Sequence, residues 1–168
     1  MLADSGVAAL GPTTWADLGC GDGMFTVALA ELLTPGSAIH AMDVDGSALQ
    51  RIPREHKRVH ITSHLGDFTN QAWPFDGLDG ILMANSLHYV DDQETFIRSC
   101  GRRMKAAGRF LIVEYDTSHA NRWVPYPMGR ARLTELFERS GYSSIKLLGM
   151  RASLYRRAPL YAAAIGFS

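Results

Sequence analysis

Asp17-Leu18-Gly19-Cys20-Gly21-Asp22-Gly23 joins an apolar run over residues 14–18 to a helical pattern over residues 24–33. Glycines at such a strand-to-helix turn permit backbone angles that other residues avoid, and they let a ligand approach the main chain. The free amides at the start of the helix attract a carboxylate or a phosphate. The stretch therefore predicts a ligand-binding loop, with a plain turn that binds nothing as the alternative.

Two classes of ligand compete for a loop of this kind. A dinucleotide site has the spacing G-x-G-x-x-G, but Met24 stands where the third glycine would be. The spacing here is G-x-G-x-G, and Asp17 lies two residues before the first glycine. A carboxylate there would repel a pyrophosphate, whereas it can pair with the α-ammonium group of S-adenosylmethionine, a phosphate-free sulfonium compound. The loop thus favours S-adenosylmethionine over NAD, and an oxidoreductase is the less favoured class of enzyme.

Apolar runs and helical patterns alternate along the whole chain, which predicts an α/β fold with a largely parallel, doubly wound sheet. The connection between the last two strands is too short for a helical crossover, so these strands should pair antiparallel. The predicted strands cover residues 14–18, 37–44, 59–65, 77–84, 109–115, 144–150 and 160–167, and the predicted helices cover residues 24–33, 46–51, 93–106 and 128–140.

Polar residues also close the strands that follow the loop. Asp43 lies about 20 residues past the loop, where a carboxylate can accept both ribose hydroxyls, and Asp45 is the less favoured ribose ligand. Asp67 can accept the adenine amino group, while Phe68 offers an apolar surface or a backbone N–H. A helix cap or a turn is the alternative role for both carboxylates. Four polar residues thus end four successive strands at one edge of the sheet: Asp17, Asp43, Asp67 and Asn85.

These features resemble the class I S-adenosylmethionine-dependent methyltransferases over residues 14–168. The glycine loop is similar to their motif I, Gly66-Asp67-Phe68 to their adenine-contact motif, and Ala84-Asn85-Ser86-Leu87-His88-Tyr89 to the motif after strand four of small-molecule members. The resemblance implies one domain over residues 1–168, with a Rossmann-like, doubly wound, seven-stranded sheet whose antiparallel C-terminal strand inserts between strands five and six. The cofactor-binding residues that it implies are Asp17, Gly19, Cys20, Gly21, Gly23, Asp43, Val44, Asp67, Phe68 and Asn85.

Three residues are candidates for the catalytic step. His88 and Tyr89 follow the strand over residues 77–84, and Asp116 follows the strand over residues 109–115, so all three are expected beside the transferred methyl group. His88 is the candidate general base if the acceptor must lose a proton. Shaping the pocket or capping the next helix is an equal alternative for this histidine.

Charge and composition bear on the substrate and on the location. Seventeen basic residues balance seventeen acidic ones, so the chain lacks the basic surplus typical of nucleic-acid binding. Its two cysteines show no metal-binding spacing and predict no metal site, and a reducing cytoplasm is the expected compartment. We find no apolar stretch of membrane-spanning length and no signal peptide pattern.

We therefore expect a cytoplasmic monomer or homodimer that methylates a small molecule, without nucleic-acid or membrane partners. An RNA methyltransferase and a non-catalytic S-adenosylmethionine-binding module are the alternatives. Only about a dozen residues precede the first strand, so the site is expected to be open, or covered by residues 116–128 or by a partner subunit.

Overall fold

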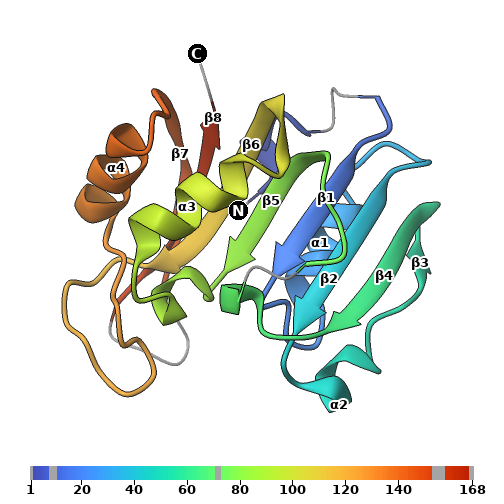
Figure 1. Ribbon diagram of the computed structural model, residues 1–168, viewed down its shortest axis with the longest axis horizontal. Coiled ribbons are helices and arrows are strands. Elements are labelled where there is room, and N and C mark those ends of the chain that lie inside the picture. Colours follow the sequence, from blue (N-terminus) through green and yellow to red (C-terminus); the bar gives the residue numbers. More distant parts are fainter. Residues whose placement is uncertain (1, 8–10, 71–72, 153–157, 167–168) are drawn as a thin grey trace.

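The computed structural model describes residues 2–7, 11–70, 73–152 and 158–166. One eight-stranded sheet, in the order β3-β4-β2-β1-β5-β6-β8-β7, carries helices on both faces (Figure 1). The strands are β1 (Thr14–Leu18), β2 (Ala38–Asp43), β3 (Glu55–His56), β4 (Val59–Leu65), β5 (Leu78–Ala84), β6 (Met104–Tyr115), β7 (Ser144–Arg151) and β8 (Leu160–Gly166). The helices are α1 (Met24–Ala30), α2 (Gly46–Leu49), α3 (Gln93–Gly101) and α4 (Arg130–Arg139), with short 3-10 turns η1 (Ala3–Ser5), η3 (Phe68–Asn70) and η4 (Leu87–Tyr89).

The strand directions confirm the predicted sheet. β1, β2, β4, β5 and β6 are parallel, and β8 inserts antiparallel between β6 and β7. The eighth strand, β3, has only two residues and pairs antiparallel with β4, and it was not predicted. Within the described ranges, no helix is both long enough and apolar enough to cross a lipid bilayer.

One predicted boundary between a helix and a strand is wrong. The helix predicted over residues 93–106 ends at Gly101, and β6 begins five residues earlier than the predicted 109–115, at Met104. Met104 pairs with Leu78 of β5, ahead of a shift in register. The Lys-Ala-Ala run after Met104 has a strong local preference for helix, and pairing with β5 overrides it. The other three helices are each a few residues shorter than predicted.

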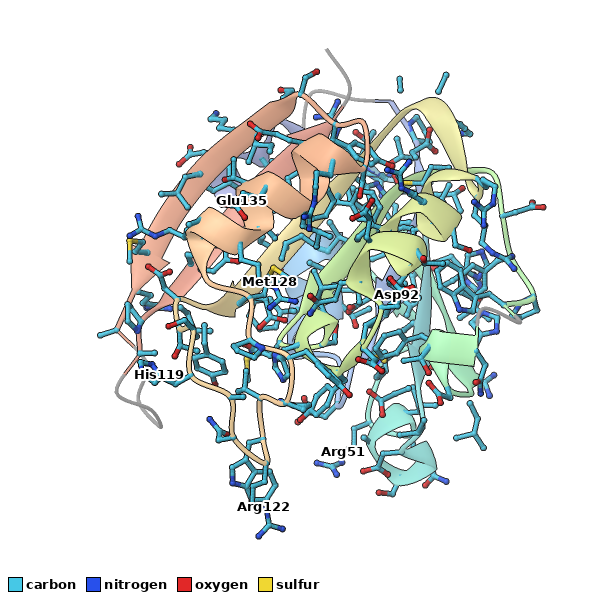
Figure 2. The ribbon with its side chains drawn as sticks, turned by 60° about the vertical axis from the view of Figure 1, so that its left-hand side comes forward. Arg51, Asp92, His119, Arg122, Met128 and Glu135 are labelled. Carbon is cyan, nitrogen blue, oxygen red and sulfur yellow. The ribbon has the colours of Figure 1, made fainter. Side chains whose placement is uncertain are left out.

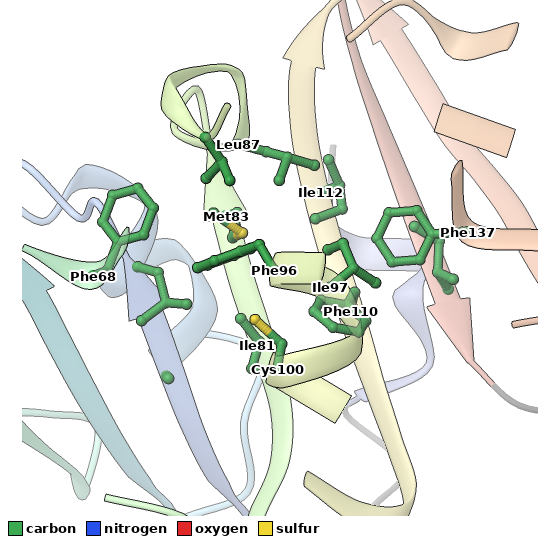
Figure 3. Close-up of a cluster of buried hydrophobic side chains, with 14 of the residues drawn as sticks. Phe68, Ile81, Met83, Leu87, Phe96, Ile97, Cys100, Phe110, Ile112 and Phe137 are labelled. Carbon is green, nitrogen blue, oxygen red and sulfur yellow. The ribbon is translucent and has the colours of Figure 1, made fainter. Parts of the chain in front are cut away.

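Two apolar clusters hold the helices to the sheet. Successive residues of β6 point to opposite faces, so Phe110 and Ile112 pack beneath α3 and α4, whereas Leu111 and Val113 join the cluster on the α1 face. Figure 3 shows the first cluster, in which aromatic and aliphatic side chains from α3 and α4 meet those of β5 and β6. Each large side chain buried in this way stabilises the fold by about 1.5–3 kcal/mol.

The two central strands meet through an indole ring and a glycine. Trp15 of β1 pairs with Gly80 of β5, and the Trp15 side chain is fully buried. A Cβ atom at residue 80 would lie 2.3–2.6 Å from three ring carbons of Trp15. The Nε1 atom of Trp15 donates a hydrogen bond to the Thr13 hydroxyl at 3.1 Å, which fixes the ring in this position. The spacing of β1 and β5 therefore requires a glycine at residue 80.

We predict that Gly80→Ala lowers the free energy of unfolding by about 2–3 kcal/mol, because a buried, hydrogen-bonded ring cannot move aside for the new methyl group. Urea unfolding measures this change. Gly11→Ala is the matched control, since nothing lies within 4 Å of the added Cβ atom, and it should change stability by less than about 0.5 kcal/mol. Equal stabilities of the two variants would contradict the packing argument.

Candidate active site

The carboxyl ends of the parallel strands meet at one edge of the sheet, at the bottom of Figure 1. The glycine loop, α2, η3, η4 and the loop over residues 116–129 all follow these strand ends. The ten predicted cofactor-binding residues and the three catalytic candidates belong to these segments or to the last residues of the strands. The fold thus brings to one edge residues that are spread over a hundred positions of the chain.

The three glycines of the loop have different surroundings. All three adopt positive φ angles, which favour glycine. A Cβ atom on Gly19 would lie 2.5 Å from the Cβ atom of Ser86, and one on Gly23 would lie 2.8 Å from Cγ1 of Ile52. Nothing lies within 4 Å of the corresponding position on Gly21. Gly19 and Gly23 therefore allow close packing inside the protein, whereas Gly21 leaves open space for a ligand.

Asp43 fastens the loop to the end of β2. Its Oδ2 atom accepts a hydrogen bond from the Gly21 amide at 2.8 Å, and its Oδ1 atom accepts one from the Asp45 amide at 2.9 Å. Each carboxylate oxygen can accept a second hydrogen bond, so the half-buried Asp43 can still bind hydroxyl groups. Asp45 instead caps α2, since its Oδ1 atom accepts bonds from the amides of Ser47 and Ala48. The next residue after Asp43, Val44, presents an exposed apolar side chain.

Asp17 is fully buried beneath the loop. Its Oδ2 atom accepts a 2.6 Å hydrogen bond from the Thr26 hydroxyl, while its Oδ1 atom has no partner among the described residues. The pKa of Asp17 is raised to about 7, chiefly by burial; the Thr26 bond lowers it, and the charge of nearby Asp43 adds a smaller upward effect. The Cys20 thiol nearby is also buried, which raises its pKa, so this cysteine is a neutral filler of the turn.

Asn85 supplies a second unpartnered acceptor, just after β5. Its Oδ1 atom is buried without a partner in the described structure, and its φ of 56° is unusual for a residue other than glycine. The Ser86 hydroxyl donates a 2.6 Å bond to the carbonyl of Leu18, which ties this turn to the glycine loop. Of the three unpartnered buried side-chain atoms in the described residues, two therefore lie at the ends of the adjacent strands β1 and β5.

The segment after β4 carries Asp67 and Phe68. The Oδ1 atom of Asp67 accepts bonds from the amide and the hydroxyl of Thr69, and the Asp67 side chain is exposed. The Phe68 ring lies in the core, 5.9 Å from the Phe96 ring, so the backbone amide is the part of Phe68 that remains for a ligand. The indole of Trp73 donates a 2.8 Å bond to the Phe68 carbonyl and holds the segment on the sheet.

The catalytic candidates differ in their surroundings. His88 is 2% exposed, whereas Tyr89 beside it is 50% exposed, and the centroids of their rings are 4.4 Å apart. Asp116 lies at the start of α4, where its two oxygens accept bonds from the backbone amide and Nε of Arg130, at 3.0 and 2.7 Å. Glu114, which was not among the predicted site residues, contacts His88 through its carboxylate at 2.7 Å. The available signal was an acid inside the apolar run Phe-Leu-Ile-Val-Glu-Tyr at residues 110–115.

Several exposed apolar side chains lie at this edge of the sheet, and we call them the apolar rim. Most of the exposed large apolar side chains in the described residues follow the carboxyl ends of strands or line the loops there, and the remaining two, Leu147 and Met150, lie on β7. The members of the rim are Met24, Val44, Leu65, Tyr89 and Trp123. Only Val44 and Tyr89 of these were predicted site residues. A rim of this composition suits a ligand with flat apolar parts.

The loop between β6 and α4 has a tight turn at its tip. Residues Asn121 and Val124 form an isolated bridge, and the Asn121 side chain accepts bonds from the amides of Trp123 and Val124. The guanidinium of Arg122 lies 4.6 Å from the centroid of the exposed Trp123 ring. Figure 2 shows Arg122 at the far end of this loop, pointing away from the body of the protein. The tip thus presents a cation and an indole together.

Residues 16–110 match the model of the methyltransferase domain. The chain belongs to the methyltransferase domain family. Membership of this family agrees with the S-adenosylmethionine cofactor that the glycine loop predicts.

Relatives of this methyltransferase domain include an uncharacterised methyltransferase of Mycobacterium tuberculosis, 25% identical over 68% of this chain and 60% of the relative. The cypemycin N-terminal methyltransferase of a Streptomyces species is 27% identical over 80% of this chain and 58% of its own length. The chain thus spans about three fifths of the length of the curated relatives that it matches. The magnesium protoporphyrin IX methyltransferase of Synechocystis PCC 6803, solved with bound S-adenosylmethionine, has the same fold, with a TM-score of 0.68 at 14% identity over 94% of this chain and 71% of that one.

The residues present fit S-adenosylmethionine. Two unpartnered acceptors, on Asp17 and Asn85, suit a ligand that carries ammonium hydrogens, and the open space at Gly21 allows the ligand to approach the loop. The described residues contain no group of three side chains that could hold a metal ion. These acceptors therefore suit a cationic, phosphate-free compound.

We predict that Asp17→Asn changes the pH dependence of stability in the absence of cofactor. The pKa of Asp17 is about 7 in the folded protein and 3.8 as an unperturbed carboxyl, so the folded state keeps a proton that the unfolded state releases. Wild-type stability should therefore fall, relative to Asp17→Asn, as the pH rises from 4 to 7, by up to about 4 kcal/mol, and then level off.

Urea unfolding of both proteins at pH 5 and pH 8 measures this difference. Asp22→Asn is the control, because Asp22 is an exposed carboxylate of the same loop. Parallel stability profiles for wild type and Asp17→Asn would rule out the raised pKa.

Proposed function

We propose that this protein transfers the methyl group of S-adenosylmethionine to a small-molecule acceptor by in-line displacement. The observation that carries the proposal is the pair of buried, unpartnered acceptors on Asp17 and Asn85 at the ends of adjacent strands. Buried acceptors without partners destabilise the protein. A ligand with ammonium hydrogens donates to Asn85, and its positive charge stabilises the Asp17 carboxylate. A pyrophosphate at the same place would add repulsion to the charge of Asp17.

Each part of the cofactor has matching residues in this proposal. Asp43 accepts the ribose hydroxyls while it braces Gly21, and Val44 lies against the adenine ring. Asp67 accepts the adenine amino group, and the Phe68 amide donates to a ring nitrogen. Asn85 accepts from the ammonium group directly, and Asp17 favours the same charge from behind the loop, through a low-dielectric interior. Gly19, Cys20 and Gly23 shape the turn around the methionine half.

When bound, the cofactor supplies an electrophilic methyl group, and the chain does the positioning. The protein holds the nucleophilic atom of the acceptor in line with the methyl carbon and excludes water. His88 takes a proton from the acceptor, and the exposed ring of Tyr89 forms one wall of the acceptor site. Asp116 has a positioning role in this proposal, since its bonds to the backbone amide and Nε of Arg130 hold the start of α4 against the end of β6.

A small molecule is the favoured acceptor for three reasons. The net charge of zero offers no general attraction to nucleic acid. The residues after β5 are Asn85-Ser86-Leu87-His88, unlike the Asn/Asp-Pro-Pro-aromatic motif typical of nucleic-acid amino-methyltransferases. Among proteins of this fold, one is named for magnesium protoporphyrin IX, a small molecule, and one relative is named for the N-terminus of cypemycin.

Two measurements test the proposal. Calorimetry with S-adenosylmethionine and S-adenosylhomocysteine should show binding to the folded protein, and no heat with either compound at millimolar concentration would refute the cofactor site. Transfer of a radiolabelled methyl group is then measured against phenols, thiols, amines and total RNA. If only RNA becomes labelled, the protein is an RNA methyltransferase and the small-molecule proposal is wrong. Cofactor binding without transfer to any acceptor would support a non-catalytic S-adenosylmethionine-binding module.

We predict that Gly21→Ala weakens binding of S-adenosylhomocysteine at least tenfold, because the added methyl group occupies the open space where the ligand meets the loop. Calorimetric titration gives the dissociation constants. Gly141→Ala is the control, since Gly141 also has a positive φ and an empty Cβ position but follows α4. The strain of the two substitutions is similar, at about 1–2 kcal/mol. Equal weakening in both variants would show that strain, and not the ligand, is responsible.

A further inference from the structure

Glu114 is a carboxylate inside an apolar strand. It has no exposed surface in β6, and its neighbours Ile112 and Val113 belong to the two apolar clusters. A charge buried in this way costs several kcal/mol unless it is well paired. An apolar side chain would fill this place without that cost. The presence of an acid here therefore calls for a specific partner.

That partner is His88, which engages both oxygens of Glu114. The backbone amide of His88 lies 3.2 Å from Oε1, and its ring atom Nδ1 lies 2.7 Å from Oε2. The two side chains are 2% and 0% exposed, so solvent screens this pair very little. Two contacts from one residue fix both the position of η4 and the rotation of the imidazole ring.

The contact also determines which ring nitrogen carries the proton. An ionised carboxylate only accepts hydrogen bonds, so Nδ1 must be the protonated nitrogen. Nε2 of the neutral ring then keeps its lone pair, and no group in the described part of the chain forms a hydrogen bond with it. A carboxylate on Nδ1 holds the imidazole in one tautomer and stabilises the positive charge that develops when Nε2 gains a proton.

The Glu114–His88 pair lies close to the proposed cofactor site. His88 follows Asn85 by three residues, in the turn that Ser86 ties to the glycine loop. The Tyr89 ring, half-exposed, lies against the His88 ring on the solvent side. An acceptor that displaces or slides past Tyr89 would therefore meet the His88 imidazole.

We propose that Glu114 is a positioning residue that makes His88 a proton acceptor, and that the methyl acceptor is therefore a hydroxyl group. The inference rests on the proposed methyl transfer. In this step the O–H bond breaks and its proton goes to Nε2 of His88. The hydroxyl oxygen forms the new bond to the methyl carbon, while the bond from that carbon to sulfur breaks and leaves its electron pair on sulfur.

A purely structural role for the pair predicts something different. If Glu114 only anchored η4 to the sheet, its loss would lower stability, and slow methylation of all acceptors alike. A positioning role adds two effects that anchoring does not produce. It assigns the wild-type proton to Nδ1, and it makes the loss of activity depend on whether the acceptor carries a proton.

The first experiment locates the proton without an acceptor. Wild type, Glu114→Met and the control Glu138→Gln, which removes an exposed carboxylate of α4, are labelled with 15N-histidine and saturated with S-adenosylhomocysteine at pH 8. Two-bond proton–nitrogen spectra identify the tautomer, and His88→Gln assigns the signal. We expect the Nδ1–H form in wild type and in Glu138→Gln, and a shift toward Nε2–H in Glu114→Met. A wild-type ring with a proton on Nε2 overturns the proposal.

The second experiment compares two acceptor probes, catechol and thiophenol. Thiophenol is ionised at pH 8 and needs no base, whereas catechol must lose a proton. Complete loss of a general base lowers a rate by about 100-fold or more. Because Glu114→Met leaves the imidazole in place, we expect a smaller loss, with kcat for catechol at least tenfold lower and KM changed less than threefold. Thiophenol methylation should change less than twofold. Equal loss with both probes overturns the positioning role.

Cofactor binding separates this inference from the proposed function. Calorimetry with S-adenosylhomocysteine should give the same affinity for wild type, Glu114→Met and Glu138→Gln. If wild type binds the compound but has its proton on Nε2, the dyad is refuted and the methyltransferase proposal stands. If wild type does not bind it, the proposed function fails. Where neither probe is methylated, the tautomer measurement decides alone.

Discussion

Three consecutive amides of the glycine loop donate hydrogen bonds to the last two residues of β2. Gly19 and Cys20 share the carbonyl of Met42, at 2.8 and 3.1 Å, and Gly21 donates to the Asp43 carboxylate. These bonds close the turn after β1 against the end of the neighbouring strand. The rest of the site is built on this closure, because it places the loop, Asp43 and the start of α2 in one rigid group. The parallel direction of the strands then brings the ends of β4, β5 and β6 alongside.

The same rigid edge of the sheet also contains buried polar atoms that have no hydrogen-bond partner in the described residues. A protein interior normally pairs its polar atoms, yet here two acceptors remain open beside a loop that also leaves space at Gly21. The raised pKa of Asp17 expresses the same imbalance, since burial penalises the charged form until a cation approaches. The empty protein therefore gives up stability at the place where a cationic ligand restores it.

The sequence was sufficient for the sheet and for the glycine loop, because both depend on local patterns. The runs over residues 14–18 and 59–65 match β1 and β4 to the residue. The start of β6 could not be predicted in this way, since its Lys-Ala-Ala run prefers a helix and only pairing with β5 makes it a strand. The two-residue β3 carries too few positions to show any alternation.

The same distinction between local patterns and tertiary contacts applies to the residues of the candidate site. Strand-end position indicated Asp43, Asp67 and Asn85, because in a parallel sheet the sequence order determines the edge. Glu114 could not be indicated, since its role depends on η4 folding back against β6, a contact between residues 26 positions apart. The core position of the Phe68 ring was likewise set by tertiary packing, against Phe96 and Trp73.

The turn at residues 121–124 is held together by contacts among its own residues. Its hydrogen bonds run among its own residues, through the Asn121 side chain and the bridge to Val124, and its cation and indole contact each other. A unit that holds its own shape can be exchanged without rebuilding the framework that carries it. Other short turns could therefore replace residues 121–124 between β6 and α4 without altering the strand ends that carry the candidate site.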